Sequence, residues 1–232
     1  MILHRRWKTL DGKRLSWLRA KYHFRVHADG NPEHGALGPL LVWNDDEVAV
    51  GAGFAMHGHR DVEIVTYVRQ GVLGHRDTLG SEGTLHAGDV QVMSAGSGIQ
   101  HEEFNRGEVP LLIYQIWLQP RESGGAPAWA TRSFPARHQH GQFTVLASGF
   151  ADDSMALPLR AEARVLCATL QAGQQIRHPL GLARQAYLVV VTGAIEVDGE
   201  AMDALDGGVI LGVDSTVIEA REDAEIIMVE VA

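Results

Sequence analysis

Short apolar runs that alternate with turn residues dominate this chain. The clearest runs cover residues 40–43, 49–54, 63–68 and 111–118. Glycine, asparagine and aspartate separate them, for example at residues 44–46 and 86–89. Many short strands divided by turn signals are typical of β-sandwiches and barrels. The pattern therefore predicts an all-β protein, in which only residues 127–132 and 154–163 are candidates for short helices.

The second half of the chain repeats the pattern of the first half. The segment LQAGQQI at residues 170–176 resembles the segment VGAGFAM at residues 50–56. Between the halves, residues 120–135 contain several prolines, glycines and serines and have the composition of a linker. We therefore predict two domains of similar fold, residues 1–125 and residues 126–232.

Composition and charge argue against several classes of protein. The 232 residues carry a net charge of −9 with histidine neutral. Proteins that grip phosphate backbones need clustered positive charge, so direct nucleic-acid binding is not expected. No apolar run approaches the roughly 20 residues of a membrane-spanning helix, and no apolar signal segment follows the basic start. The single cysteine, Cys167, allows no internal disulfide and fits the reducing cytoplasm, where we expect the protein.

Two pairs of metal-binding residue types stand out in the first half. His57 and His59 are two positions apart, and so are His101 and Glu103. Because side chains alternate between the faces of a strand, the members of each pair project to the same side. If the two strands are neighbours, three imidazoles and a carboxylate converge on one point. Such a donor set suits one divalent transition metal, such as Fe, Mn, Ni, Cu or Zn, with positions left open for a substrate.

The sequence offers two candidates for the fourth ligand. Glu63 stands four residues after His59 and is predicted to face the same way, while Glu103 stands two residues after His101. Glu102 is predicted to point to the other face. The alternative role for Glu63 is a carboxylate that supports the site through hydrogen bonds. Other histidines, such as His4, His75 and His86, lie in polar surroundings and are not expected to be ligands.

The second half lacks the equivalent histidines. At an offset of 120 residues, Arg177 and Pro179 stand where His57 and His59 stand in the first half. Only His178 lies between them, and no histidine follows it. We therefore predict one metal site, in the first domain, and a second domain without metal ligands.

The residues around the two pairs resemble a known signature. The segments are GFAMHGHRDVEIVTYVRQG at residues 53–71 and GDVQVMSAGSGIQHEEFN at residues 88–105. They are similar to the two-part cupin motif, but Ser94 stands where proline is usual and the spacer from Gly96 to His101 is longer. These departures, together with YQIW at residues 114–117, resemble the pirin branch of the cupin superfamily.

The resemblance implies a bicupin fold, with two β-barrel or jelly-roll domains in tandem. It also favours Glu103 over Glu63 as the fourth metal ligand. Pirins that resemble quercetin 2,3-dioxygenase are metal-dependent dioxygenases, so the resemblance implies a small aromatic substrate such as a flavonol. Ring opening with O2 would then release carbon monoxide. Glu103 would be both a ligand and the base that takes the hydroxyl proton.

A second function is compatible with the same motifs. Eukaryotic pirins are thought to act in transcription, so the resemblance also allows a metal-containing regulator without catalytic activity. Such a protein would use its metal to tune contact with a partner protein. The sequence alone decides neither between the two functions nor among the metals, because substrate and partner contacts depend on loops that no motif fixes.

Overall fold

The computed structural model describes residues 1–26, 28–134 and 141–232. In this part of the chain the regular elements are β-strands, apart from one 3-10 turn, η1 (Trp7–Thr9). The all-β prediction is therefore confirmed. No described helix is long and apolar enough to cross a membrane.

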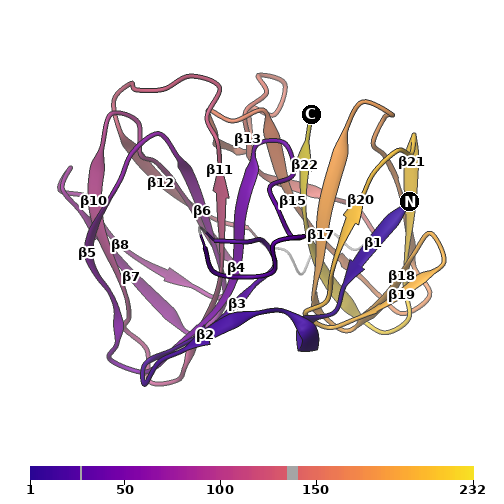
Figure 1. The fold of residues 1–232 in the computed structure, drawn as a ribbon, viewed down its shortest axis with the longest axis horizontal. Coiled ribbons are helices and arrows are strands. Elements are labelled where there is room, and N and C mark those ends of the chain that lie inside the picture. The colour runs from indigo at the N-terminus through magenta and orange to yellow at the C-terminus, as the bar shows by residue number, and fades with distance from the viewer. Residues whose placement is uncertain (27, 135–140) are drawn as a thin grey trace. The chain divides into compact units, whose positions relative to one another are not determined.

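Contacts divide the chain into two compact units. The N-terminal unit consists of Asp11–Phe134 and Leu157–Glu162, and the C-terminal unit of Met1–Leu10, Pro135–Ala156 and Ala163–Ala232. The first residues belong to the C-terminal unit because β1 (Ile2–Arg5) pairs antiparallel with β20 (Gly207–Ile210) (Figure 1). A boundary between separately folding domains at residues 125 and 126 stays a prediction.

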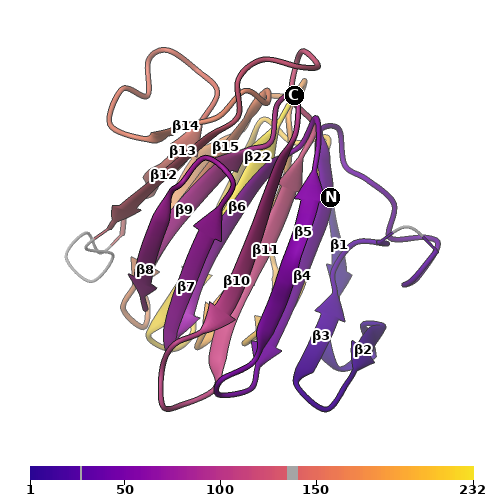
Figure 2. The same ribbon diagram turned by 90° about the vertical axis from the view of Figure 1, so that its left-hand side faces the viewer.

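Two sheets build the N-terminal unit. One has the strand order β12-β9-β6-β11-β4-β3-β2, and the other has the order β5-β10-β7-β8, which lies in the foreground of Figure 2. The strands are β2 (Gly12–Arg14), β3 (Leu18–Tyr22), β4 (Leu40–Val48), β5 (Gly53–His59), β6 (Glu63–Gln70), β7 (Val72–Asp77), β8 (Glu82–His86), β9 (Asp89–Ser94), β10 (Ile99–Asn105), β11 (Leu111–Leu118) and β12 (Ala128–Ser133).

The C-terminal unit repeats this arrangement. One sheet includes the run β1-β20-β17-β22-β15-β13, and the other has the order β16-β21-β18-β19. Besides β1 and β20, the strands are β13 (Thr144–Ser148), β15 (Ala163–Leu170), β16 (Gln175–Pro179), β17 (Gln185–Thr192), β18 (Ala194–Val197), β19 (Glu200–Asp203), β21 (Ser215–Ala220) and β22 (Ala224–Val231). The run β9-β6-β11-β4 of the first unit thus has the same order as β20-β17-β22-β15 of the second. The predicted tandem of two cupin-like folds is confirmed.

Both helix predictions are wrong. Residues 127–132 lie mostly in strand β12, and residues 154–163 contain turns and the two-residue strand β14 (Leu157–Pro158). In β12, Trp129 pairs with Met93 of β9 and packs against buried side chains of the unit. Burial of this large ring and pairing with β9 outweigh local helix propensity. The expected linker at residues 120–135 therefore contains a strand, and its last residue, Pro135, lies outside the described residues.

The interior of the N-terminal unit has a polar layer between two apolar layers. Along β6, Ile64, Thr66 and Val68 share one face, and Ile64 and Val68 belong to different apolar clusters. The neighbouring strands place Gln91 and Gln115 opposite Thr66, and Glu103 of the other sheet accepts hydrogen bonds from all three side chains. Strand β6 thus alternates with period two, yet interrupts its inward apolar face with the polar residue Thr66.

The interior of the C-terminal unit is apolar at the equivalent level. Its core cluster includes Ile176, Leu188, Ile218 and Met228. Ile176 and His178 face inward from β16, whereas Arg177 and Pro179 are exposed. The offset of 120 residues also predicts that Arg177, His178 and Pro179 line the second barrel, and this is right only for His178, because a strand shows only every second residue to its core.

Gly53 is required by the close approach of β5 and β10. A Cβ atom at this position would overlap the carbonyl oxygen of Glu103 and the Cα of Phe104, whereas a Cβ at Gly58 on the same strand would make only ordinary contacts, with Gln100 Cγ at 3.7 Å and Ile99 O at 3.8 Å. We expect Gly53→Ala to lower the free energy of unfolding by about 1–3 kcal/mol, the usual cost of overpacking. The control Gly58→Ala is expected to stay within about 0.5 kcal/mol. Equal stability of both variants in denaturant unfolding would contradict this assignment.

Candidate metal centre

The pairing of β5 with β10 brings the two predicted ligand pairs together. His101 pairs with His57, and Ile99 pairs with His59. The register shifts between His101 and Glu103, so that Glu103 faces Phe54. This irregularity is a β-bulge, which lets Phe54 and His57 share a face although they are three residues apart. Bulges of this kind often re-aim side chains at functional sites.

The three predicted imidazoles form a compact cluster. The ring centroids of His57 and His101 are 4.5 Å apart, those of His57 and His59 4.8 Å, and those of His59 and His101 5.1 Å. Each ring offers a nitrogen that lies within 4.8 Å of the nitrogens of the other two. The structure therefore brings together His57, His59 and His101.

The protonation of these rings suits metal binding. Burial, and after it the neighbouring rings of His57, His59 and His75, lower the pKa of His101 to about 2. Burial and then His57 lower the pKa of His59 to about 4. His59 and His101 are therefore neutral at pH 7, the state in which an imidazole nitrogen can donate its lone pair.

Hydrogen bonds assign the nitrogens that are available. His57 Nδ1 lies 2.8 Å from the backbone oxygen of Ala55, an acceptor, so Nδ1 carries the proton and Nε2 has the lone pair. Both ring nitrogens of His101 are buried and have no hydrogen-bond partner among the described residues. A buried polar atom without a partner is costly, and a bound metal ion would satisfy it.

Glu103 is buried in the polar layer and surrounded by donors. Gln91 Nε2 donates to its Oε1 and Gln115 Nε2 to its Oε2, while Thr66 Oγ1 lies 3.4 Å from Oε1. Burial raises the pKa of Glu103 to about 7, although these three hydrogen bonds act in the opposite direction. Amide donors on both oxygens favour the carboxylate form over the carboxylic acid, and a cation beside it would do the same.

Two tryptophans orient the amides that hold Glu103. Trp129 Nε1 donates to Gln91 Oε1 at 3.0 Å, and Trp117 Nε1 donates to Gln115 Oε1 at 3.4 Å. An indole N–H can only donate, so each amide must turn its oxygen to the tryptophan and its NH2 group to Glu103. The sequence left the role of Gln115 open and gave no sign of Gln91, because a glutamine on a strand carries no motif of its own.

Glu63 faces away from the cluster, contrary to the expectation that it shares a face with His59. Asp61, with φ +52°, lies between β5 and β6, so the alternation of β5 does not continue to Glu63. Glu63 Oε2 accepts hydrogen bonds from Ser94 Oγ at 2.7 Å and from the backbone N–H of Arg160 at 3.0 Å. These hydrogen bonds tie Glu63 to β9 and to the segment at Arg160, and neither of them goes to a residue of the cluster.

Glu102 points to the outer face of β10, as predicted. Arg76 Nε donates to Glu102 Oε1 at 2.8 Å, and the arginine side chain is largely exposed. Within β10, Glu102 is partly exposed, whereas its neighbours His101 and Glu103 are buried.

His75 was wrongly assigned to polar, loop-like surroundings. It is fully buried in β7, pairs with Glu103 across the sheet, and stacks on Trp129 with ring centroids 4.8 Å apart and planes at 10°. Its Nε2 lies 3.1 Å from Asp77 Oδ2. The alternation of Leu73, His75 and Asp77 is the signal that could have placed this histidine on an inward face.

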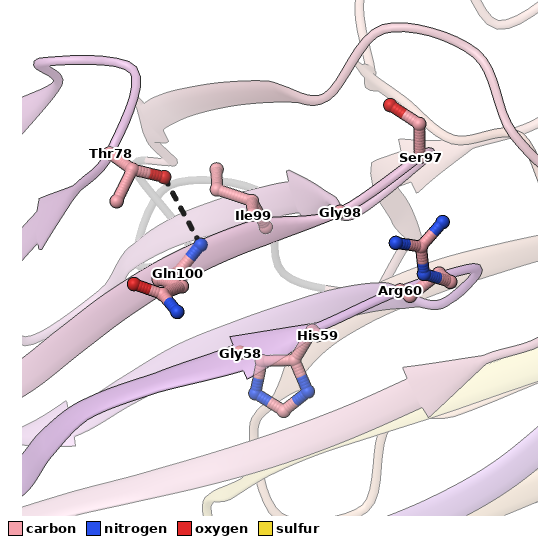
Figure 3. A pocket seen from close by; sticks show the side chains of 8 residues that line it. All are labelled: Gly58, His59, Arg60, Thr78, Ser97, Gly98, Ile99 and Gln100. Carbon is pink, nitrogen blue, oxygen red and sulfur yellow. Dashed lines mark hydrogen bonds between the residues drawn. The ribbon is translucent and has the colours of Figure 1, made fainter.

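A polar depression of about 520 Å³ lies beside the imidazoles, and His59 and its cross-strand partner Ile99 belong to its lining (Figure 3). Gly58 and Gln100, which line it, are cross-strand partners and therefore face opposite to the partners His57 and His101. At its edge the backbone N–H of Gln100 donates to Thr78 Oγ1 at 3.2 Å, as Figure 3 shows. The depression therefore reaches one predicted ligand, His59, although Gly58 and Gln100 belong to the opposite face of the two strands.

The apolar side chains of the two ligand segments, Phe54, Met56 and Met93, differ in their surroundings. Met93 is buried in an apolar core cluster, and Phe54 packs on Trp17 with ring centroids 5.2 Å apart. Met56 is exposed. At the cluster itself, Trp117 supplies an aromatic wall, with its ring centroid 5.0 Å from that of His59.

The residues present fit a divalent transition metal. Three imidazoles within one small volume, next to a buried carboxylate, provide the borderline-soft donors that Fe, Ni, Cu and Zn accept. The hydrogen bond from His57 Nδ1 to a backbone carbonyl is the usual support of a metal-binding histidine.

Comparisons with known proteins agree with the fold. The family model described as Pirin matches residues 5–118, and the model described as Quercetinase C-terminal cupin domain matches residues 145–231. A pirin-like protein of Caulobacter vibrioides is 47% identical over 232 residues, the full length of both chains. The quercetin 2,3-dioxygenase of Escherichia coli K12 is 32% identical over 213 residues, which covers 91% of this chain and 90% of that protein.

Solved structures extend this agreement. The crystal structure of the bacterial pirin YhhW from Escherichia coli in complex with nickel(II) superimposes with a TM-score of 0.92 and 30% sequence identity, covering 100% of this chain and 99% of that one. The likeness spans both barrels, and both family models match their respective halves. The chain therefore belongs to the pirin family of tandem cupin proteins.

Proposed function

We propose that this protein is a metal-dependent dioxygenase that opens the ring of a flavonol such as quercetin with O2 and releases carbon monoxide. One divalent transition metal would be held by His57, His59, His101 and Glu103. The observation that carries the proposal is the cluster of three imidazoles beside a buried carboxylate that is held by amide donors. The dioxygenase name of a relative that is 32% identical supports the choice of substrate.

Each residue has a role in this proposal. When bound, the metal would supply Lewis-acid and redox chemistry toward the flavonol oxygens and O2. Glu103, whose pKa lies near 7, would take the 3-hydroxyl proton on a carboxylate oxygen. Gln91 and Gln115 keep that carboxylate in place, and Trp117 offers an aromatic wall beside His59 for a planar substrate.

Removal of imidazoles should remove the metal. We expect the wild-type protein to hold about one transition metal per chain, His101→Ala to hold none, and His57→Ala to bind at least about tenfold more weakly, since a ligand is lost. His86→Gln, a change at an exposed histidine of β8, is the control and should keep full occupancy. The metal content of all four proteins is measured after dialysis. Full metal occupancy of the His101→Ala variant would refute the proposed metal centre.

The two glutamates of β10 should differ sharply. Glu103→Gln is expected to weaken metal binding about 10–100-fold, because it replaces a buried carboxylate at the cluster, while Glu102→Gln should change the affinity less than about twofold. The metal affinities of both variants are measured by competition with a chelator. If Glu63→Gln gave the largest loss without unfolding the protein, the fourth ligand would have to be reassigned.

Flavonol turnover should depend on the metal. Anaerobic addition of quercetin to metal-loaded protein is expected to shift the flavonol absorption band, because the chelating oxygens bind at the centre, and O2 should then bleach the band and release carbon monoxide. The metal-free protein and the His101→Ala variant are the controls. Bleaching by metal-free protein would refute the mechanism, and metal-dependent binding without turnover would favour the regulatory hypothesis with a partner protein.

A further inference from the structure

Two overlapping groups of ligand atoms meet at His101. One consists of His57, His59 and His101, and the other of His75, His101 and Glu103; in each, the ligand atoms lie within 4.8 Å of one another. Glu103 therefore groups with His75 rather than with the pair on β5. We propose that His75 is a further metal ligand, at an inner coordination position formed by His75, His101 and Glu103. The proposal rests on the metal centre of the proposed function.

The inner group has the chemistry of a known kind of site. Two imidazoles and one carboxylate form the ligand set of many mononuclear iron and zinc enzymes, which keep other positions open. His75 is fully buried, and His101 and Glu103 are each 1% exposed. Water has little access to these three side chains, so the protein must satisfy their polar atoms by other means.

His75 has the support that a ligand histidine needs. Its Nε2 lies 3.1 Å from Asp77 Oδ2, and the other oxygen of Asp77 accepts the backbone N–H groups of Leu79 at 2.9 Å and Ser81 at 3.0 Å. A carboxylate accepts, so the imidazole proton is on Nε2 and the lone pair is on Nδ1. Metal-binding histidines commonly donate their second nitrogen to a carboxylate in this way.

The other nitrogen of His75 has no hydrogen-bond partner. His75 Nδ1 is buried and unpaired among the described residues, and so are both ring nitrogens of His101, which lies 5.4 Å from His75 between ring centroids. Stacking on Trp129 fixes the plane of the His75 ring. Two buried imidazoles thus keep unused nitrogens beside a buried carboxylate, and a divalent cation would satisfy them together.

The inner position gives the centre five candidate ligands for one ion. His101 belongs to both groups, so an ion could be held by His101 and Glu103 together with His75, or by His101 with the β5 pair. His57 and His59 are partly exposed, whereas the inner residues are buried. Loss of the β5 pair should therefore weaken the binding of metal without abolishing it.

Cobalt(II) titration followed by visible absorption tests the inner position. We expect the double variant His57→Ala/His59→Ala to bind one Co²⁺ per chain about 100-fold more weakly than the wild type, and addition of His75→Gln to weaken it at least about tenfold more. Addition of His86→Gln to the double variant is the matched control and should leave its affinity unchanged. Circular dichroism confirms that each variant is folded.

Each outcome has a distinct meaning. Absence of Co²⁺ binding by the wild type would remove the metal centre and with it both proposals. Binding by the wild type but none by the folded double variant, or equal affinities with and without His75, would overturn the inner position alone. If the triple variant does not fold, proton NMR of the Co²⁺-loaded double variant decides: a strongly shifted, exchangeable N–H of His75, held by Asp77, is expected, and its absence overturns the proposal.

Discussion

The burial of Glu103 is the constraint on which the rest of the centre depends. An ionised carboxylate without partners inside a protein is strongly unfavourable, so its surroundings must supply donors or a cation. Gln91 and Gln115 provide amide donors, and Trp117 and Trp129 turn those amides the right way. The polar layer of the N-terminal barrel thus holds one buried carboxylate in place. The imidazoles beside this carboxylate complete the candidate metal site.

The two barrels differ in what fills their interiors: the N-terminal barrel has a polar layer where the C-terminal barrel has apolar side chains. The same strand order occurs in both units, but the C-terminal unit fills its interior with an apolar cluster that includes Ile176, Leu188 and Met228. That packing is the simplest way to stabilise a barrel of this size. The N-terminal unit gives up continuous apolar packing at one level, and the two apolar clusters on either side retain the stability of the fold.

The tandem fold and the cluster of three imidazoles could be predicted from the sequence, because the strand pattern repeats along the chain and side chains alternate along each strand. Strand alternation places His57 with His59, and His101 with Glu103, once both segments are recognised as strands. Alternation failed where the chain leaves a strand: the turn at Asp61 reverses the side to which Glu63 points. Alternation could have placed His75 on an inward face, but it could not show that this residue lies beside Glu103, because that contact comes from pairing between β7 and β10.

The pairing of β1 with β20 has a consequence for synthesis on the ribosome. β1 leaves the exit tunnel before its partner, residues 207–210, is made, and all strands of the N-terminal barrel are made between the two. Until then the nascent chain carries an unpaired strand and an incomplete C-terminal barrel, a state open to misfolding and aggregation. The N-terminal barrel, whose strands β2 to β12 follow one another in the chain, can assemble earlier. A bulky fusion placed before Met1 would therefore hinder the pairing of β1 with β20. It would disturb the folding of the C-terminal barrel, although most of that barrel lies far along the chain from the fusion.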